Sequence, residues 1–269
     1  MEDKESITIR KAVINQAINY IFEHIDEDIM VEDVAKYCSY SKYHLMRMFK
    51  EDMDEALYQF IKRVRLERSA WRLKVEKERS ITEIGETYGY SSSNFATAFK
   101  KHLDISPADY RRSSEQMVED SSFSHGMTLD DLDDAGSEIT VEYLAPFTVL
   151  YERKKGNYHN LSDEWCDFIE KYKYLATKDT LYIDCTIDDP SITDEDGCMY
   201  ELCQTVIPGH PVLKDHPEIL LHDFEGGKYA VYHFKGVPQL LFMVYQEIFC
   251  RWLSKTGNEL DERPIIDIY

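Results

Sequence analysis

Apolar residues recur at helical spacing through the first 110 residues of the chain. Proline is absent between residues 7 and 106, and glycine occurs there only at Gly85 and Gly89. One amphipathic stripe covers residues 8–25, and a second begins at Leu57 and continues beyond Val64. Because apolar positions at i, i+3, i+4 and i+7 share one face of a helix, this part is predicted to be all-α. The second stripe is long enough to join two smaller helical units.

The pattern changes twice after this helical part. Residues 113–138 are rich in Ser, Asp and Glu and poor in apolar residues, which predicts an acidic, flexible linker. From residue 139 onward, short β-branched and aromatic runs alternate with amphipathic helices. The predicted strands are residues 139–144, 147–154, 180–188, 199–207, 228–236 and 264–269, and the predicted helices are residues 160–175 and 239–253.

An internal repeat organises this second part. Residues 147–170 and 228–253 share one plan, in which an aromatic strand leads through a basic, glycine-containing turn into an amphipathic helix. We therefore expect an α+β domain at residues 139–269, made of two pseudo-symmetric strand-helix-strand-strand halves. A cleft between two such halves is a natural place for a small ligand.

The stretch "SYSKYHLMRMFK", residues 39–50, sorts its residues by helical face. With Ser41 as N-cap, Leu45, Met48 and Phe49 fall on one face. The opposite face carries Tyr43, Met46, Arg47 and Lys50. A short amphipathic helix precedes this stretch, so the pair fits a helix-turn-helix with a basic outer face. Taken alone, the stretch also fits an ordinary surface helix.

A second copy of this plan favours the helix-turn-helix interpretation. "ITEIGETYGYSSSNFATAFKK" repeats it with an offset of 50 residues, so that Phe95, Ala98 and Phe99 correspond to Leu45, Met48 and Phe49. Two such units on one connecting helix can present two recognition helices to successive major grooves. A monomer of this kind would read a site of roughly 20 base pairs.

The charge distribution agrees with two regions that have different partners. The chain of 269 residues carries a net charge of −20. Residues 1–116 contribute only −2 and residues 117–269 contribute −18, whereas residues 36–79 carry 12 basic and 7 acidic residues. The basic stretch suits a polyanion, which the acidic second part would repel.

The remaining composition predicts a cytoplasmic protein without metal or cofactor. No run approaches the length of a membrane span, and the charged beginning "MEDKESITIR" lacks an apolar signal core, so no membrane partner is expected. The six cysteines form no CxxC pair, which favours reduced, buried thiols over a zinc site.

The helical part resembles the DNA-binding domain of AraC/XylS-type transcription regulators. The matching motifs are "YSKYHLMRMFK", "RVRLERSAWRL" and "ITEIGETYGYSSSNFATAFKKHLDISPADYR", within residues 7–112. The resemblance implies double-stranded DNA as a partner and contact with RNA polymerase. Its base-reading positions map onto Tyr43, Met46, Arg47, Ser92, Ser93, Asn94 and Thr97. The predicted phosphate contacts are Lys42, His44, Lys50, Lys100 and Lys101, each of which is otherwise a solvated surface residue.

Arg47 is the strongest base-reading candidate, since a guanidinium can hold guanine O6 and N7 with two hydrogen bonds. The chain departs from the family pattern at Thr97, where an arginine is common, and in a shorter turn before Asn94. Asp54 and Asp104 replace the usual glycine after each recognition helix, and Asp tolerates the left-handed conformation expected there. The second recognition helix is therefore expected either to read bases or mainly to grip the backbone.

Residues 139–269 resemble GyrI-like effector-binding domains through "KGNY", "DDPSI", "GGKYAVYHFKG", "RWLSKTGNEL" and "RPIIDIY". Relatives in multidrug-responsive regulators bind lipophilic cations in an aromatic cleft with a buried acid. Aromatic rings and a carboxylate suit an organic cation chemically. The candidate effector residues are Trp165, Tyr200, Glu201, Tyr229, Trp252, Asp267 and Tyr269. Asp267 stands where the family usually has Glu.

Several of these residues would also fit a purely structural role. Trp165 and Trp252 lie in apolar helical stripes that core packing would explain, while Glu201 and Asp267 would also suit a solvated position. The leading function is a transcription regulator controlled by a small, aromatic or cationic effector, and not an enzyme. The alternatives are a constitutive DNA-binding protein whose second domain contacts another protein, and a hydrolase of the GyrI-like type.

Overall fold

The computed structural model describes residues 4–114, 139–156, 161–216, 218–235, 241–258, 260–261 and 263–269. Of the predicted linker 113–138, all but the first two residues lies outside the described part. Among the helices in the described ranges, none is both long enough and apolar enough to span a membrane.

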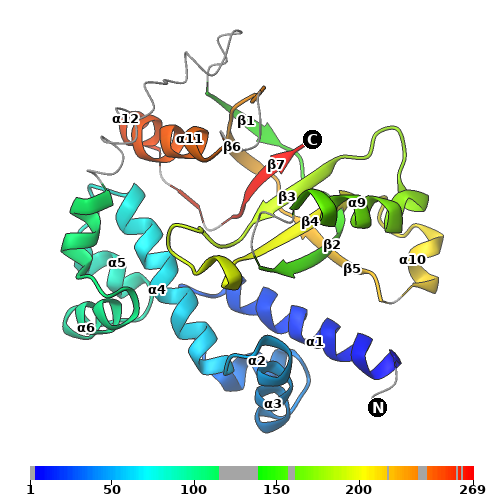
Figure 1. Ribbon diagram of the computed structural model, residues 1–269, viewed down its shortest axis with the longest axis horizontal. Coiled ribbons are helices and arrows are strands. Elements are labelled where there is room, and N and C mark those ends of the chain that lie inside the picture. Colours follow the sequence, from blue (N-terminus) through cyan, green and yellow to red (C-terminus); the bar gives the residue numbers. More distant parts are fainter. Residues whose placement is uncertain are drawn as a thin grey trace.

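The first part of the chain is entirely helical, as predicted. Its helices are α1 (Lys4–Glu23), α2 (Val31–Tyr37), α3 (Lys42–Met53), α4 (Leu57–Val75), α5 (Ile81–Thr87) and α6 (Ser92–Leu103), followed by helical residues 107–114. Helix α4 lies between the α2–α3 pair and the α5–α6 pair (Figure 1). We refer to residues 4–114 as the head.

The two helix-turn-helix units are copies at an offset of 50 residues. Helices α2 and α5 have seven residues each, and α3 and α6 have twelve each. Ser41 caps α3 as predicted, because its side chain accepts a hydrogen bond from the backbone N–H of His44. Asp54 and Asp104 end the two recognition helices with φ of 57° and 59°, so both take the left-handed conformation expected of them.

The copies differ in how their two helices approach each other. In the first unit, Ala35 of α2 and Leu45 of α3 are buried. The second unit has Gly85 and Phe95 at these positions, and a Cβ atom at position 85 would lie 2.7 Å from Cγ of Phe95. The larger ring in α6 therefore occupies the space that a methyl group fills in the first unit.

The second part is an α+β domain built on antiparallel strands. Its strands are β1 (Thr140–Leu144), β2 (Phe147–Lys155), β3 (Tyr182–Thr186), β4 (Met199–Thr205), β5 (Leu220–Phe224), β6 (Gly227–Val231) and β7 (Ile265–Ile268). Five of them form a sheet in the order β5-β2-β4-β3-β7, while β1 pairs with β6 in a two-stranded sheet. We refer to residues 139–269 as the C-terminal domain.

The helices of this domain are interrupted more often than predicted. They are α9 (Leu161–Tyr172), η2 (Lys173–Leu175), η3 (Glu195–Gly197), α10 (Pro211–Asp215), α11 (Leu241–Gln246), the π-helix η5 (Glu247–Trp252) and α12 (Leu253–Thr256). Strand β5 and helix α10 were not predicted. The first predicted half supplies β2, β3 and β4 at the centre of the sheet, whereas β5 and β7 lie at its edges, and the expected pseudo-symmetry is not confirmed.

The five-stranded sheet packs against a different helix on each face (Figure 1). Leu150, Tyr200 and Leu202 pack with Phe168 of α9. On the opposite face, the Tyr151 hydroxyl accepts a hydrogen bond from Asn19 of α1. Helix α1 of the head therefore covers one face of the sheet in the C-terminal domain.

A buried ion pair lies at this contact with α1. Arg153 of β2 and Glu201 of β4 form a salt bridge with side-chain exposures of 7% and 8%. Arg153 also donates to Asn15 Oδ1 at 2.9 Å and to Asn19 Oδ1. These bonds give the guanidinium several acceptors where water is scarce, as a buried charge requires.

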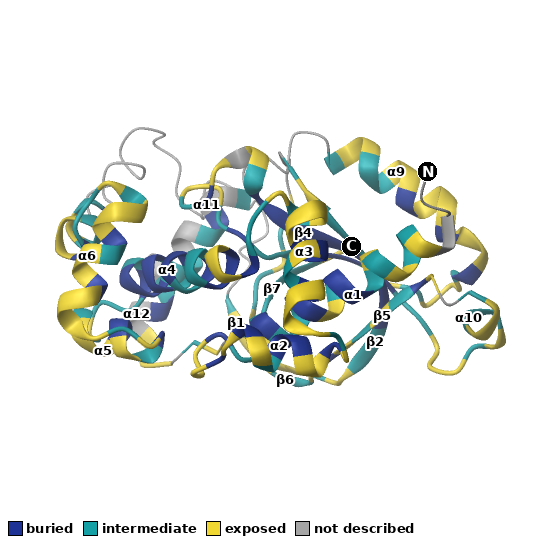
Figure 2. Cartoon of the chain, turned by 90° about the horizontal axis from the view of Figure 1, so that it is seen from below, coloured by how far each residue is buried: buried dark blue, intermediate teal, exposed yellow. Residues whose placement is uncertain are grey.

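The segment between β3 and β4 joins the core of the head. Met199 belongs to the same buried cluster as the apolar residues of α1 to α6, and Ile187 and Ile192 pack against that cluster. Lys74 of α4 forms an ion pair with Asp189 at 3.3 Å, and Thr193 donates to Glu67 at 3.1 Å. Buried residues run along α4 towards the C-terminal domain in Figure 2. Apolar and polar contacts thus hold the two domains together.

Candidate functional site

The outer faces of both recognition helices are open to solvent. Tyr43 is 87% exposed and the Arg47 side chain is 67% exposed, while Met46 is half-buried. In the second helix Ser92, Ser93, Asn94 and Thr97 are all exposed. The predicted phosphate contacts are exposed as well: Lys42, His44, Lys50, Lys100 and Lys101.

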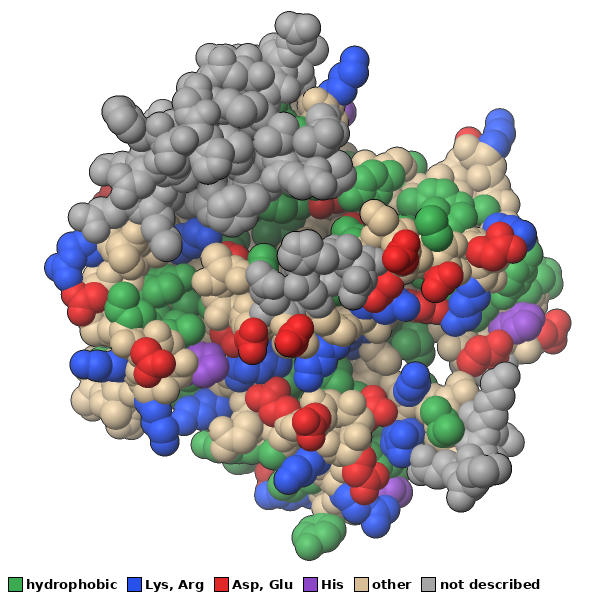
Figure 3. All heavy atoms as spheres, viewed as in Figure 1, with side chains coloured by type: hydrophobic (Ala, Val, Ile, Leu, Met, Phe, Trp, Pro, Cys, Tyr) green, Lys and Arg blue, Asp and Glu red, His purple; other side chains and the backbone are tan. Residues whose placement is uncertain are grey.

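Local interactions already hold some of these side chains. Lys42 pairs with Glu32 at 2.6 Å, and Arg47 lies 3.9 Å from Glu51 one turn further along α3. The Thr97 hydroxyl donates to the Ser93 carbonyl at 3.1 Å. Lys and Arg side chains lie along the lower and left margins of the view in Figure 3, interspersed with carboxylates. Exposed ion pairs of this kind are weak, so the side chains of Lys42 and Arg47 remain available to bind DNA.

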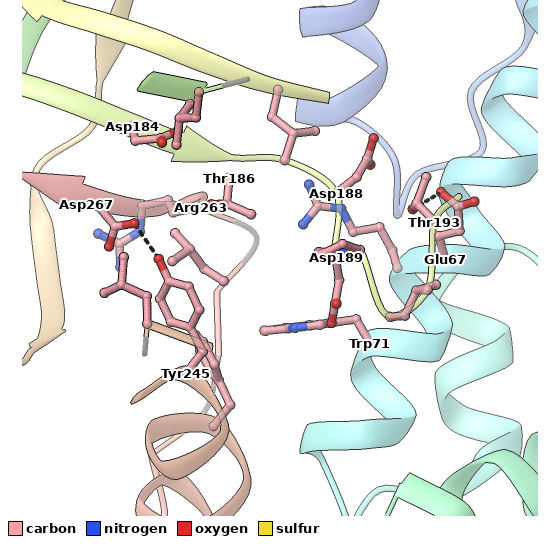
Figure 4. A pocket seen from close by; sticks show the side chains of 18 of the residues that line it. Glu67, Trp71, Asp184, Thr186, Asp188, Asp189, Thr193, Tyr245, Arg263 and Asp267 are labelled. Atoms are coloured by element: carbon pink, nitrogen blue, oxygen red, sulfur yellow. Dashed lines mark hydrogen bonds between the residues drawn. The ribbon is translucent and has the colours of Figure 1, made fainter. Parts of the chain in front are cut away.

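A cavity of about 840 Å³ lies where the head meets the C-terminal domain (Figure 4). Helix α4 contributes Val64, Glu67, Arg68, Trp71, Lys74 and Val75 to its wall. The rest of the wall comes from β3, β7, α9, α11, η5 and the segment after β3. The helix that joins the two helix-turn-helix units is therefore part of the cavity.

Aromatic rings line much of this cavity. The rings come from Trp71, Trp165, Tyr182, Tyr245, Phe249 and Tyr269. Trp71 of α4 meets Phe249 of η5 edge-to-face at 5.4 Å between ring centroids. Trp165 of α9 meets both Tyr182 and Tyr269 edge-to-face, at 6.1 Å and 6.0 Å. Such rings offer faces and edges to a flat or cationic ligand.

Two carboxylates enter the cavity from neighbouring strands. Asp267 of β7 accepts a hydrogen bond of 2.5 Å from the Tyr245 hydroxyl, which is drawn as a dashed line in Figure 4. Burial raises the pKa of Asp267, and this hydrogen bond lowers it in part. The pKa of the Tyr245 hydroxyl is raised by burial and by the charge of Asp267. Tyr245 therefore remains a hydrogen-bond donor to Asp267.

The second carboxylate belongs to Asp184 of β3. Its residue is 4% exposed, and its buried Oδ1 atom has no hydrogen-bond partner in the described part of the chain. Burial first, and then the charge of Asp267, raise the pKa of Asp184 from 3.8 to about 7. This carboxylate is thus held in an environment that disfavours its charge.

Most of the other charged groups of the wall have ion-pair partners, while Arg68, which also lines it, lies over the Phe22 ring at 5.9 Å. Glu67 pairs with Arg63 at 2.8 Å, and Lys74 pairs with Asp189. Arg263 pairs with Asp261 at 2.8 Å and also donates to two backbone carbonyl oxygens. Within the described residues, Asp184 and Asp267 form no ion pair.

The structure places the predicted effector residues in two groups. Trp165, Asp267 and Tyr269 line the cavity. Tyr200, Glu201, Tyr229 and Trp252 are not among the described residues that line it.

Each residue of the second group has another environment. Tyr200 is buried in the core beneath α9, and Glu201 faces α1 and pairs with Arg153. Tyr229 lies in the two-stranded sheet, with the Arg263 guanidinium 4.7 Å from its ring centroid. Trp252 is half-buried at the end of η5.

Sequence reasoning missed Asp184 and Trp71 as cavity residues. Strand alternation in "YIDCT" puts Asp184 on the same face as Tyr182, and that pattern was readable. The pairing of β3 with β7, which brings Asp184 opposite Asp267, has no local signal. Trp71 stood out only as part of an apolar stripe, because its contact with η5 spans 178 positions of the sequence.

Comparisons with known proteins agree with this architecture, in which a helix-turn-helix head is joined to a cavity-bearing domain, and they define the class as DNA-binding transcription regulators. Residues 34–113 match a family described as "Helix-turn-helix domain", and residues 137–269 match the "GyrI-like small molecule binding domain". The chain belongs to the AraC-type family of DNA-binding transcription regulators and carries a GyrI-like domain.

Three curated relatives illustrate the two levels of similarity. Regulatory protein SoxS of Salmonella typhimurium is 37% identical over 100 residues, which are 37% of this chain and 92% of that protein. The Right origin-binding protein of Escherichia coli K12 is 28% identical over 253 residues, which cover 87% of this chain and 83% of that protein. Transcriptional regulator Rob of Salmonella typhimurium is 38% identical over 104 residues, which are 38% of this chain but only 36% of that protein.

Proposed function

We propose that this protein is a sequence-specific transcription regulator whose cavity binds a small organic cation and thereby changes how the head binds DNA or engages RNA polymerase. The observation that carries the proposal is the shared cavity wall. Helix α4 of the head and the sheet of the C-terminal domain both contribute to it. A ligand in the cavity contacts both domains at once.

The exposed faces of α3 and α6 support the DNA-binding half of the proposal. Arg47 and Tyr43 project from α3 without being covered by the C-terminal domain. Arg47 reads a guanine, and the lysines at the ends of the recognition helices contact phosphates. The Thr97 hydroxyl is bonded to the main-chain carbonyl of Ser93. The second recognition helix therefore contributes mainly contacts to the DNA sugar-phosphate backbone.

The chemistry of the cavity supports an organic cation as effector. A cation gains attraction from the faces of aromatic rings and from an unpaired carboxylate. Asp267 supplies the charge, and Trp165 and Tyr269 supply rings beside it. At Asp184 and Asp267 an anion would meet repulsion from two carboxylates that form no ion pair within the described residues.

Coupling to DNA follows from the position of α4. A ligand shifts a conformational equilibrium only if it binds one state more tightly than the other. Trp71 and Phe249 meet across the domain contact and both line the cavity, so a ligand that contacts both rings binds best to one relative position of α4 and η5. Because α4 also joins the two helix-turn-helix units, a change in its position alters how the head meets DNA.

Calorimetric titration of the full-length protein tests the ligand half. At pH 8 we would compare 1-methyl-4-(4-methylphenyl)pyridinium, a monocation, with 4,4′-bipyridine, which is flat and neutral. We expect saturable binding of the cation only, and a loss of at least about tenfold in affinity in Asp267→Asn, which corresponds to 1.4 kcal/mol. Equal binding of the neutral compound would contradict the proposal.

A shift assay on DNA selected from random duplexes tests the DNA half. The same protein, with and without saturating cation, should differ in its affinity for the selected sites. If the cation binds but leaves DNA affinity unchanged, the coupling through α4 is wrong while the ligand site stands.

A further inference from the structure

Asp184 and Asp267 face each other across neighbouring strands. In the antiparallel pairing of β3 with β7 they are directly opposite, and both lie on the cavity side of the sheet (Figure 4). Cβ atoms of directly opposite residues are about 4.5–5.5 Å apart, and like charges at such positions destabilise a sheet. This pair therefore lowers the stability of the protein, and packing gives no reason for it.

The hydrogen bonds of the pair are incomplete. Tyr245 has a single hydroxyl proton, and it is donated to Asp267. Asp184 Oδ1 is buried and has no partner in the described part of the chain. A buried acceptor without a donor costs about 1–3 kcal/mol, and more if it is charged. A ligand that brings a positive charge to Asp184 offsets the part of this cost that comes from the charge of the carboxylate.

The charge of the wall points to the number of positive charges that the ligand carries. The other described carboxylates of the wall lie beside Arg63, Lys74 or Arg263. Once Asp184 has lost its proton, at pH values above its pKa of about 7, Asp184 and Asp267 together leave two negative charges without an ion-pair partner within the described residues. One monocation would neutralise only one of them, and the second would stay buried and uncompensated.

We propose that Asp184 and Asp267 form a carboxylate pair that selects an organic dication over a monocation of the same outline. The inference rests on the proposed cation site and specifies its ligand class. The aromatic wall favours an organic ligand, because a bare metal ion would leave most of the 840 Å³ unfilled. In the described residues no group of three or more His, Cys, Asp or Glu side chains is placed to hold a metal ion.

The test compares two matched ligands with the full-length protein. Methyl viologen carries two charges and 1-methyl-4-(4-methylphenyl)pyridinium carries one, and the two molecules have the same outline. Calorimetry is done at pH 8 in 150 mM salt, which limits the long-range attraction of any dication to an acidic protein. We expect wild type to bind methyl viologen at least about tenfold more tightly than the monocation.

Two variants with the same change in net charge separate local from global effects. In Asp184→Asn the preference for the dication should fall below about threefold, because one of the two charges is gone, while the monocation affinity stays within about threefold. In Asp179→Asn, which removes an exposed carboxylate in the loop before β3, the preference should be that of wild type.

Each other outcome overturns the inference in a recognisable way. Equal affinities for both cations in wild type, or a preference that survives Asp184→Asn, would refute the dication assignment and leave the cation site standing. Binding of neither cation would refute both the dication assignment and the proposed cation site. Competition between Mg²⁺ and methyl viologen that depends on Asp184 would assign the pair to a metal ion instead.

Discussion

Asp184 makes stability depend on pH in a direction opposite to that of most acidic residues. Its pKa is raised in the folded protein from 3.8 to about 7, so the folded state holds a proton that the unfolded state has already released. The free energy of unfolding therefore falls as pH rises from about 4 to 7, and the loss is complete above pH 7.

Asp184→Asn should remove this dependence. Between pH 5 and pH 8, the stability advantage of the variant over wild type should grow by roughly 2–3 kcal/mol, since one pKa unit corresponds to 1.36 kcal/mol. Urea unfolding at the two pH values measures it. Asp179→Asn serves as the control and should show no such growth; a constant difference for Asp184→Asn would mean that the carboxylate is ionised throughout.

Arg47 is the residue on which sequence-specific binding should depend most. Arg47→Ala should weaken binding to selected sites by about 1–3 kcal/mol and relax the preference at one base pair. Lys50→Ala should weaken binding to all sequences and reduce the salt slope by about 1. Shift assays over a range of salt concentrations distinguish the two, and identical behaviour of both variants would contradict the assignment of Arg47.

Helix packing in the second helix-turn-helix unit depends on the absence of a single methyl group. Gly85→Ala should destabilise the protein by about 1–3 kcal/mol, because the new Cβ would overlap the Phe95 ring. Adding Phe95→Leu recreates the Ala35–Leu45 pair of the first unit and should restore part of that loss.

Thermal unfolding of the single and double variants measures this compensation. Ala35→Gly in the first unit is the matched control, and it should cost roughly 1 kcal/mol for a helical glycine and about 0.8 kcal/mol for the lost buried methyl group. Additive effects of Gly85→Ala and Phe95→Leu would show that the two positions do not interact.

Elements that depend on local sequence patterns could be predicted, whereas features that depend on contacts between distant parts of the sequence could not. Ser41 as a cap, the repeat at an offset of 50 and the long helix from Leu57 are local patterns, and all three are present. Strand β5 was missed because "LLHDF" combines His and Asp with a short apolar run, and its pairing with β2 is long-range. The place of Asp267 in the cavity likewise depends on sheet order, which no local pattern contains.

At the scale of the whole molecule, α4 both lines the cavity and joins the two helix-turn-helix units, so the proposed function makes it the link between ligand and DNA. Trp71→Ala should weaken binding of an aromatic cation by about 0.5–2 kcal/mol, although Trp71 belongs to the head. Tyr58→Ala is the control, because Tyr58 is an exposed aromatic residue on the same helix that does not line the cavity. Calorimetric titration of the cation into both variants measures this difference in affinity. Equal losses of affinity in Trp71→Ala and Tyr58→Ala would place the ligand away from α4.

Linkage gives a second test at this scale. If the cation changes DNA affinity by some factor, DNA must change the cation affinity by the same factor. Titrating the cation into the protein with and without a saturating selected site measures the second factor, and the shift assay measures the first. Unequal factors would indicate that the cation also binds outside the cavity.

The core shared by the two domains has a consequence for how the chain is made. Residues 187–199, which pack against the head, are synthesised more than 100 residues after α4 ends at Val75. At about 5–20 residues per second, the ribosome takes about 6 to 25 seconds to supply all of them. During that interval the apolar side chains of the nascent head that pack with Ile187, Ile192 and Met199 in the folded protein remain exposed. They become buried when these three residues have been synthesised.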